Sequence, residues 1–460
     1  MKTIGSARKG SLGLIILAII ASLSLVARIY SLSRPGATWA MEHDSTGYIR
    51  LANGLKAGCG FAPRWQTGVC GPAELQRTPG YPLFLSISSS LRSVVAIQAA
   101  LGTGVCFLVA LFARRRWGLP AAIIAESIIG FDLSSIIVGN LIMSEILFTS
   151  IISVAILLQL MIICRAVVDL RAIAGMLGVA FLIGIAALVR PIGQVLLIVV
   201  PLAVVPLSTI SLKKRIILSM LVLSIPVGVI MSWSYRNYRQ RGLWTFSTIE
   251  AANLNYTLAA GVIAYESGRS IDEVVADRLR LAGRESGPPD LWSKTFDEDP
   301  KEMMDRGLQV LLSHPSVTAF IAVKGFLRSW IMPPNRIGLS TFLGHQVDRG
   351  EANAFISRNI LSTIRSTLSS RWLASIRALL FFQLAVNIFT VIGVGLAVSR
   401  AFSARSPDAW LVIIPLVAAT LLLLAAAGPG ESDRYRVPAT PMLALIAAFG
   451  WTVGNRREAG

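Results

Sequence analysis

The chain has 460 residues, of which 54% are hydrophobic and only 15% are charged, and its mean hydropathy is +0.65. This composition excludes a soluble globular domain and indicates a polytopic membrane protein. The formal net charge of +18 does not indicate nucleic-acid binding, because many of the basic residues flank apolar segments, where they set the orientation of a membrane protein.

Apolar segments long enough to cross a bilayer recur along the chain. A spanning helix needs about 20 apolar residues, since its backbone N–H and C=O groups must bond within the segment. The first segment follows Lys2, Arg8 and Lys9 but lacks a small-residue cleavage site, so we interpret it as a retained helix and not as a signal peptide. We expect about ten spans, at residues 11–30, 92–113, 119–139, 141–164, 172–189, 191–211, 216–234, 377–398, 409–427 and 437–453.

The basic residues predict how these spans are oriented. Clusters such as Arg114 to Arg116 and Lys213 to Arg215 fall on every second loop, and both ends of the chain are basic. Because cytoplasmic loops accumulate Lys and Arg, we expect both termini in the cytoplasm and a multi-pass protein of the inner or plasma membrane. The outer segments are then 31–76, about 235–371, and the short loop around Asp433.

This pattern divides the chain into three parts. We expect an N-terminal transmembrane module at 1–234 that contains a first outer loop at 31–80, an extracytoplasmic and interfacial helical segment at 235–375, and C-terminal transmembrane helices at 376–460. In the middle part, Ser270 with Glu273 and Asp299 with Pro300 predict two helix starts. Residues 317–335 are apolar but carry Lys324 and Arg328, so an interfacial or re-entrant helix fits better than a span.

The basic amphipathic stretch at 356–377 is typical of a helix lying at the headgroups, and a solvated connector between spans is the alternative. Taken together, these elements predict an all-α membrane bundle with a small helical extracytoplasmic layer.

Two acidic residues, Glu42 and Asp44, follow the first span and precede an amphipathic run. A carboxylate in an outer loop can act as a general base. The structural alternative for Asp44 is the N-cap of the helix that begins near Ser45, because Asp is a favoured capping residue. With no further oxygen ligands nearby, the two acids leave the question of a divalent cation open, and the sequence identifies no cofactor.

The first outer loop also contains Cys59 and Cys70. In an oxidising compartment these two residues are expected to form a disulfide that closes a short loop, and a pair of free thiols is the alternative. Cys106 and Cys164 fall within apolar segments and are interpreted as small core residues.

Arg77 lies immediately before the second span, and Pro79 and Pro82 turn the chain into the membrane. A guanidinium held at headgroup height suits a lipid phosphate, and an interface anchor is the alternative. Within the spans, Glu145 and Asp132 are costly in hydrocarbon, so both are expected to border the same cavity near the outer helix ends. For Arg190, phosphate contact and structural pairing are equally open.

The order and placement of five short motifs resemble the GT-C glycosyltransferases, and within them the bacterial branch related to protein O-mannosyltransferases and the lipid A aminoarabinose transferase. The motifs are Asp44 with the run at 47–55, the segment 77–82, Ser144 with Glu145, Arg190 with Pro191, and the segment 434–438. Many relatives carry adjacent acids in the first loop, whereas here His43 separates Glu42 from Asp44.

The resemblance implies a GT-C-like bundle that transfers a sugar from a polyprenyl-phosphate donor to a glycan, lipid or protein acceptor on the outer face of the membrane. By position, Asp44 would be the catalytic base, with Glu42 as a second acid. Arg77, Arg434, Arg436 and Arg190 would contact the donor phosphate. The substrate cavity would include Tyr48, Tyr81, Glu145 and Tyr435. The alternative function is a transporter or flippase for a lipid-linked sugar, although no matching halves with broken helices are visible.

Overall fold

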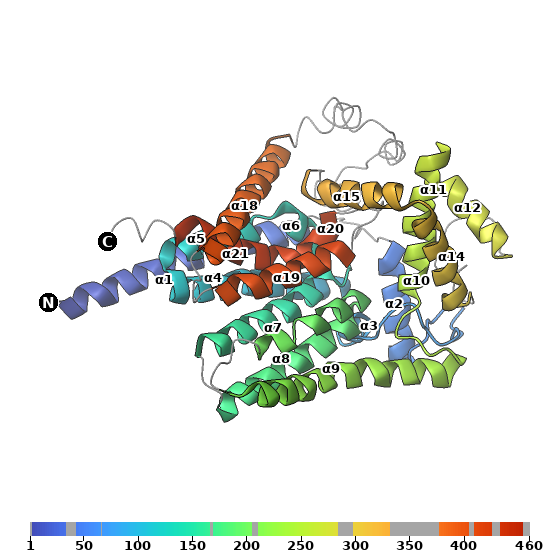
Figure 1. The fold of residues 1–460 in the computed structure, drawn as a ribbon, viewed down its shortest axis with the longest axis horizontal. Coiled ribbons are helices and arrows are strands. Elements are labelled where there is room, and N and C mark those ends of the chain that lie inside the picture. The colour runs from blue at the N-terminus through green and yellow to red at the C-terminus, as the bar shows by residue number, and fades with distance from the viewer. Residues whose placement is uncertain are drawn as a thin grey trace.

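The computed structural model describes residues 2–33, 43–65, 67–165, 169–204, 210–283, 298–331, 377–403, 409–425 and 433–453. These residues are almost entirely helical, and within them the only β-type pairing is an isolated bridge between Arg64 and Cys70. The expected all-α architecture is therefore confirmed (Figure 1).

Six helices in the described part of the chain are long and apolar enough to cross a membrane, and up to eight if each of two bent pairs counts as one span. This makes the chain a multi-pass membrane protein. The bent pairs are α5 (Leu119–Gly130) with α6 (Leu133–Gly139), at 50°, and α14 (Pro300–Ser313) with α15 (Pro315–Ile331), at 101°. The six helices are α1 (Lys2–Ile29), α4 (Leu91–Trp117), α7 (Glu145–Arg165), α8 (Leu170–Val189), α9 (Leu212–Arg241) and α18 (Arg377–Ser403).

Four of the ten expected spans take other forms, and one of them, 119–139, is the bent pair of α5 and α6. Within the expected span 191–211, the described residues 191–204 form two 3₁₀ helices in place of an α-helix, η2 (Pro191–Ile198) and η3 (Pro201–Ala203). Pro201 lies inside this range, where a proline removes one backbone hydrogen bond of an α-helix and its ring clashes with the preceding turn. The last two apolar segments form α19 (Ala409–Ala425) and the pair η8 (Val437–Ala439) and α21 (Thr440–Thr452), which are shorter than the usual span.

The core of the bundle surrounds α21, which packs against α4, α5 and α18. Its residues from Thr440 to Gly450 are all buried. By contrast, α9 is a peripheral helix whose apolar side chains, such as Met220 and Ile217, are exposed as expected for a surface that faces lipid. The helix α1 also joins the bundle, since Leu17 is buried against α4 and α5.

A group of shorter helices covers one end of this bundle, and we call it the end layer (Figure 1). The two predicted helix starts are confirmed here: Ser270 and Glu273 form a capping box, and the Asp299 side chain accepts a hydrogen bond from the backbone N–H of Lys301. The basic stretch at 356–377 lies outside the described residues, except for Arg377, which begins α18. The end layer consists of α2 (His43–Lys56), α10 (Ile249–Asn253), the π-helix η4 (Leu254–Ala259), α11 (Ala260–Ser267), α12 (Ile271–Leu281) and α14.

Three of the four cysteines have the expected role, and one does not. Cys59 and Cys70 form a disulfide, which confirms the prediction for the first loop. Cys106 is buried, whereas Cys164 is exposed near the end of α7. The interpretation of Cys164 as a core residue is therefore wrong.

Candidate functional site

Asp44 lies between two arginines that come from opposite ends of the sequence. It belongs to the first turn of α2, so it is not the residue that caps this helix. Its Oδ1 atom lies 3.3 Å from Nη2 of Arg77, and its Oδ2 atom lies 3.3 Å from Nη2 of Arg434. The carboxylate is 22% exposed, so it is largely enclosed but still reachable.

A second carboxylate extends this cluster into the bundle. Glu145, the first residue of α7, is fully buried, and its Oε1 atom lies 2.5 Å from Nη1 of Arg190. The same oxygen lies 3.8 Å from Nε of Arg434, which therefore links the two acids. The described residues thus form an alternating row, Arg77, Asp44, Arg434, Glu145 and Arg190. With all five groups ionised, the row carries one excess positive charge.

The backbone around Arg77 is held by contacts that sequence reasoning did not identify. The Oε1 atom of Glu74 accepts the backbone N–H groups of Gln76 and Arg77, at 2.7 and 3.3 Å. Arg236, near the end of α9, donates to the carbonyls of Glu74 and Phe61, at 2.7 and 2.9 Å. No motif marks Glu74 or Arg236, because their contacts depend on how the first loop lies against α9.

Aromatic residues line the cluster, as the resemblance implied for two of the three tyrosines. The guanidinium of Arg77 lies 5.5 Å from the centroid of the Tyr48 ring, and that of Arg434 lies 5.0 Å from the Tyr435 ring. Both are cation–π contacts. Tyr81 is fully buried behind Tyr48, with ring centroids 4.9 Å apart, and donates to Gln98 Oε1 at 2.8 Å. It supports the site from behind and does not line it.

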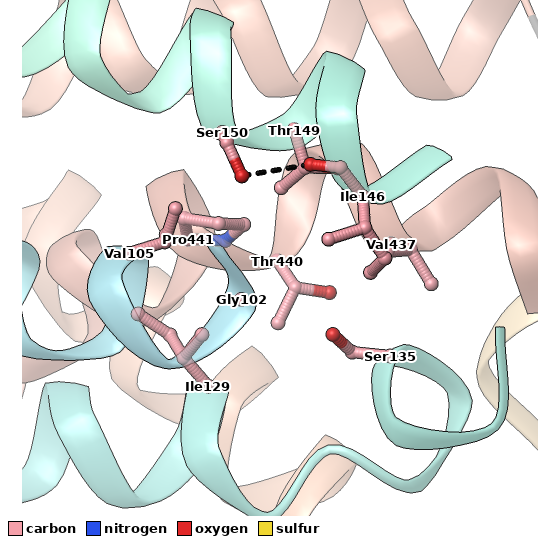
Figure 2. A pocket seen from close by; sticks show the side chains of 10 residues that line it. All are labelled: Gly102, Val105, Ile129, Ser135, Ile146, Thr149, Ser150, Val437, Thr440 and Pro441. Carbon is pink, nitrogen blue, oxygen red and sulfur yellow. Dashed lines mark hydrogen bonds between the residues drawn. The ribbon is translucent and has the colours of Figure 1, made fainter. Parts of the chain in front are cut away.

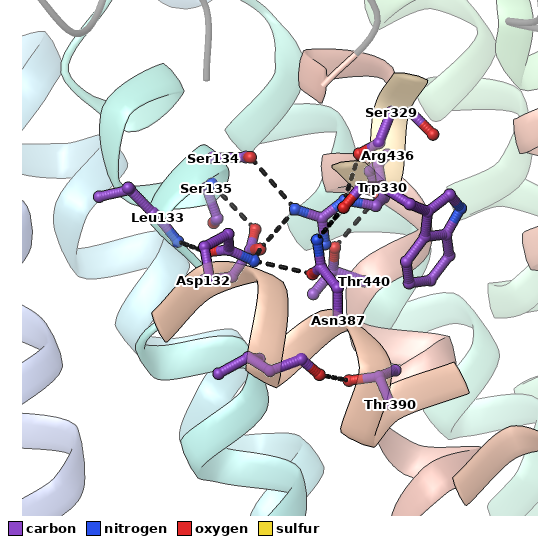
Figure 3. Close-up of polar contacts among 12 residues, drawn as sticks. Asp132, Leu133, Ser134, Ser135, Ser329, Trp330, Asn387, Thr390, Arg436 and Thr440 are labelled. Carbon is purple, nitrogen blue, oxygen red and sulfur yellow. Dashed lines mark hydrogen bonds and ion pairs between the residues drawn. The ribbon is translucent and has the colours of Figure 1, made fainter. Parts of the chain in front are cut away.

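Two residues expected at this site belong to a different cluster. Arg436 pairs with Asp132: its Nη2 atom lies 2.7 Å from Oδ1 of Asp132 (Figure 3). Arg434 and Arg436 share the short helix α20 (Asp433–Arg436), and residues two apart on a helix face nearly opposite directions, about 200° apart. Asp132, expected beside Glu145, instead caps α6 by accepting the Ser135 N–H at 3.0 Å.

Glu42 lies outside the described residues, so the structure says nothing of its part in the site. Among the described residues, no group of three or more His, Cys, Asp or Glu side chains is placed to hold a metal ion.

A cavity of about 10 Å³ lies deeper in the bundle, between Ile146, Val437 and Thr440 (Figure 2). This volume is enough for roughly one water molecule, so the cavity is not a substrate pocket.

The electrostatics of the cluster keep Asp44 ionised. Burial raises the pKa of the Asp44 carboxyl, but the charges of Arg434, Arg77 and Arg190 outweigh it, and the net pKa lies below its usual value of 3.8. Burial likewise opposes the charge of Arg434, yet Tyr435, Glu145 and Asp44 raise its pKa well above the usual value. The site therefore presents fixed charges at neutral pH.

Comparisons with known proteins identify the fold. No protein-family profile and no curated protein sequence matches the chain. Among solved structures, it resembles the oligosaccharyltransferase of Archaeoglobus fulgidus in the apo form, with 15% identity and a TM-score of 0.53 over 97% of this chain and 51% of that one. The same archaeal enzyme, AglB, in complex with an inhibitory peptide and a dolichol-phosphate gives 15% identity and a TM-score of 0.53, over 98% of this chain and 51% of that one.

ArnT from Cupriavidus metallidurans bound to undecaprenyl phosphate also matches, with 15% identity over 96% of this chain and 78% of that one, at a TM-score of 0.35. That score is too low to indicate a shared fold by itself. The chain spans about half the length of the oligosaccharyltransferase structures that it resembles. Since the oligosaccharyltransferase is a GT-C protein, the chain has a GT-C fold, as the sequence resemblance implied.

Proposed function

We propose that this chain, as a protein with the GT-C fold, is a membrane glycosyltransferase that moves a sugar from a polyprenyl-phosphate donor to an envelope acceptor on the outer face of the membrane. The observation that carries the proposal is the position of Asp44 between Arg77 and Arg434, each 3.3 Å away. This arrangement combines a carboxylate that can accept a proton with two guanidinium groups that can bind a phosphate.

Each group has a defined part in the proposed reaction. An acceptor hydroxyl attacks the anomeric carbon of the sugar, and its proton passes to the Asp44 carboxylate as the new glycosidic bond forms. The bond between the anomeric carbon and the phosphate oxygen breaks, and the polyprenyl phosphate leaves with the electron pair. Arg77 and Arg434 stabilise the negative charge that develops on that oxygen. One base together with two guanidinium groups favours a single displacement, with inversion of configuration at the anomeric carbon.

The contacts of Asp44 also suggest the order in which the two substrates bind. Both carboxylate oxygens contact arginines at 3.3 Å, which is longer than the 2.7–2.9 Å of strong charge-assisted hydrogen bonds. A donor phosphate competes with Asp44 for these guanidinium groups. Donor binding would therefore free the carboxylate to act as a base, so the donor should bind before the acceptor.

Two further observations support this proposal. The archaeal oligosaccharyltransferase has been solved with a dolichol-phosphate, which belongs to the same chemical class as the proposed donor. In this chain, Glu145 begins α7 and Arg190 follows α8, so the charged row gathers at helix ends beside the end layer. A transporter or flippase for a lipid-linked sugar would instead need ionisable groups along a path through the bundle.

The experiment that tests the proposal is sugar transfer in proteoliposomes from a labelled polyprenyl-phosphate sugar. The purified protein should transfer label to an envelope extract, and Asp44→Asn should abolish transfer. Asp277→Asn, a change on the end-layer helix α12, is the matched control and should leave transfer unchanged. Normal turnover by Asp44→Asn would remove Asp44 as the base. Profiling of envelope glycans in a strain without the protein would then identify the acceptor class.

A further inference from the structure

A second ion pair, between Arg436 and Asp132, is buried more deeply than the pairs of the candidate site. Arg436 is 3% exposed and Asp132 is 1% exposed. Arg436 also donates from Nη2 to the Ser134 hydroxyl and from Nε to the Ser329 carbonyl, both at 3.1 Å (Figure 3). The proposed transfer reaction assigns no step to this pair.

The Asp132 carboxylate connects several elements that are distant in sequence. Gln383 of α18 donates to Asp132 Oδ1 at 3.0 Å and accepts the Leu133 N–H at 2.6 Å. Asn387, one turn further along α18, donates to the Trp330 carbonyl of α15 at 2.6 Å. The helices α6, α15, α18 and α20 therefore meet around one carboxylate, and Arg436 is the side chain through which α20 joins them.

The helix α20 has only four residues and continues directly through η8 into α21. Four residues have little helical stability of their own, so the orientation of α20 depends on this connection and on tertiary contacts such as the pair between Arg436 and Asp132. Since Arg434 and Arg436 face nearly opposite directions, fixing Arg436 toward Asp132 turns Arg434 toward Asp44 and Glu145. Removing one partner of a buried ion pair leaves the other charge buried and unpaired, so Arg436 is strongly held to Asp132.

We propose that Asp132 and Arg436 are positioning residues that hold Arg434 against Asp44. The proposal rests on the proposed function, since Arg434 is taken to bind the donor phosphate. Neither residue of the pair touches the donor or the acceptor. Breaking the pair loosens Arg434 but leaves the contact between Asp44 and Arg77 in place. The enzyme should therefore use the donor less well, while its use of the acceptor is unchanged.

The test combines Asp132→Asn with Arg434→Ala. Asparagine keeps an oxygen that can cap α6 but removes the charge that binds Arg436. We expect Asp132→Asn to lower kcat/KM for the donor roughly tenfold, mainly through KM, and to leave KM for the acceptor unchanged. In an Arg434→Ala background the same change should have little further effect. If the two losses multiply, Asp132 acts independently of Arg434 and the proposal is overturned.

A conservative variant and a folding control separate positioning from general damage. Arg436→Lys keeps a charge for Asp132 and should retain more donor use than Arg436→Gln; equal donor use by both would contradict the proposal. Gln159→Leu, a change at a buried side chain that donates to the Val199 carbonyl, serves as the control for destabilisation. The Gln159→Leu variant should have a lower Tm but an unchanged ratio of donor KM to acceptor KM. If Asp132→Asn fails to assemble, Arg436→Lys and Arg436→Gln carry the same comparison in both backgrounds.

Binding of a fluorescent polyprenyl phosphate to the purified protein separates this proposal from the proposed function. If the wild type binds the lipid phosphate and Asp132→Asn binds it more weakly, both proposals are supported. If the wild type binds and Asp132→Asn binds equally well, the positioning proposal fails alone. If the wild type does not bind at all, the proposed function fails and the positioning proposal falls with it.

Discussion

The guanidinium of Arg77 occupies the space beside Gly47 on α2, where an added Cβ atom would lie 2.5 Å from Arg77 Cζ. Three atoms of the guanidinium group lie within 2.8 Å of that Cβ position, so any larger residue must displace it. The absence of a side chain at Gly47 therefore leaves the space that the Arg77 guanidinium occupies. Gly47 lies about one turn after the start of α2, close to Asp44, so the open space beside it lets Arg77 contact Asp44.

Gly47→Ala should weaken donor use by displacing Arg77, although alanine favours a helix by about 1 kcal/mol over glycine. The expected result is a higher KM for the donor with unchanged expression. Gly104→Ala on α4 is the matched control, because nothing lies within 4 Å of its Cβ position. Initial rates at varied donor concentration measure the effect, and unchanged donor KM in Gly47→Ala would contradict the assignment of Arg77.

Asp44→Asn should separate binding from turnover. Removing the carboxylate removes the group that competes with phosphate for Arg77 and Arg434. We therefore expect tighter binding of a polyprenyl phosphate together with loss of transfer. Titration of a fluorescent lipid phosphate into the purified variant tests this, and weaker binding than in the wild type would rule out the competition.

Arg77→Ala should impair donor use more than acceptor use, since a guanidinium at this position has a phosphate as its proposed partner. Steady-state kinetics with each substrate varied in turn provide the comparison. Arg280→Ala, a change at an exposed arginine of α12, controls for loss of charge alone. Equal losses for donor and acceptor would argue against phosphate recognition.

The pH dependence of transfer follows from the lowered pKa of Asp44. In the free enzyme the carboxylate stays ionised below its usual range, so kcat/KM for the donor should not fall between pH 7 and about 5. Once a phosphate engages the arginines, the pKa of Asp44 should rise, so kcat should fall at a higher pH than kcat/KM does. Coincident acid limbs in the two profiles would contradict the proposed release of Asp44.

The lowered pKa of Asp44 also makes the stability of the folded protein depend on pH. Because the folded-state pKa of Asp44 is below its unfolded value, the favourable contribution of its ion pairs is present above the unfolded pKa. It is lost as the pH falls through the folded value. The difference in Tm between wild type and Asp44→Asn should therefore be constant near neutral pH and change only below about pH 4.

The disulfide between Cys59 and Cys70 should stabilise the loop that leads to Arg77. Closing a loop of this length contributes about 3 kcal/mol in the chain-entropy model. Replacing both cysteines by serine should lower the Tm and raise the donor KM, because Phe61 and Glu74 of this loop contact Arg236. Cys164→Ser, at an exposed cysteine outside the disulfide, is the control. An unchanged Tm in the double-serine variant would show that the loop is held by its other contacts.

The sequence by itself determined the features that depend on local composition and order. Apolar length predicted most of the spans, capping residues predicted two end-layer helices, and the order of short motifs predicted the GT-C fold. The resemblance to the GT-C glycosyltransferases selected Asp44, Arg77, Glu145, Arg190 and Arg434, which the structure brings together. The spans and the two end-layer helices could be predicted because hydrophobic length and capping act over a few residues.

Only the tertiary structure decided which partner each charged group takes. Arg434 and Arg436 are equivalent in the sequence, yet one meets Asp44 and the other Asp132, because a short helix turns them in opposite directions. Gly47, Glu74 and Arg236 carry no motif, since their roles arise where α2, the first loop and α9 lie against one another. Contacts between residues far apart in the chain depend on how the helices pack, and local patterns do not contain that information.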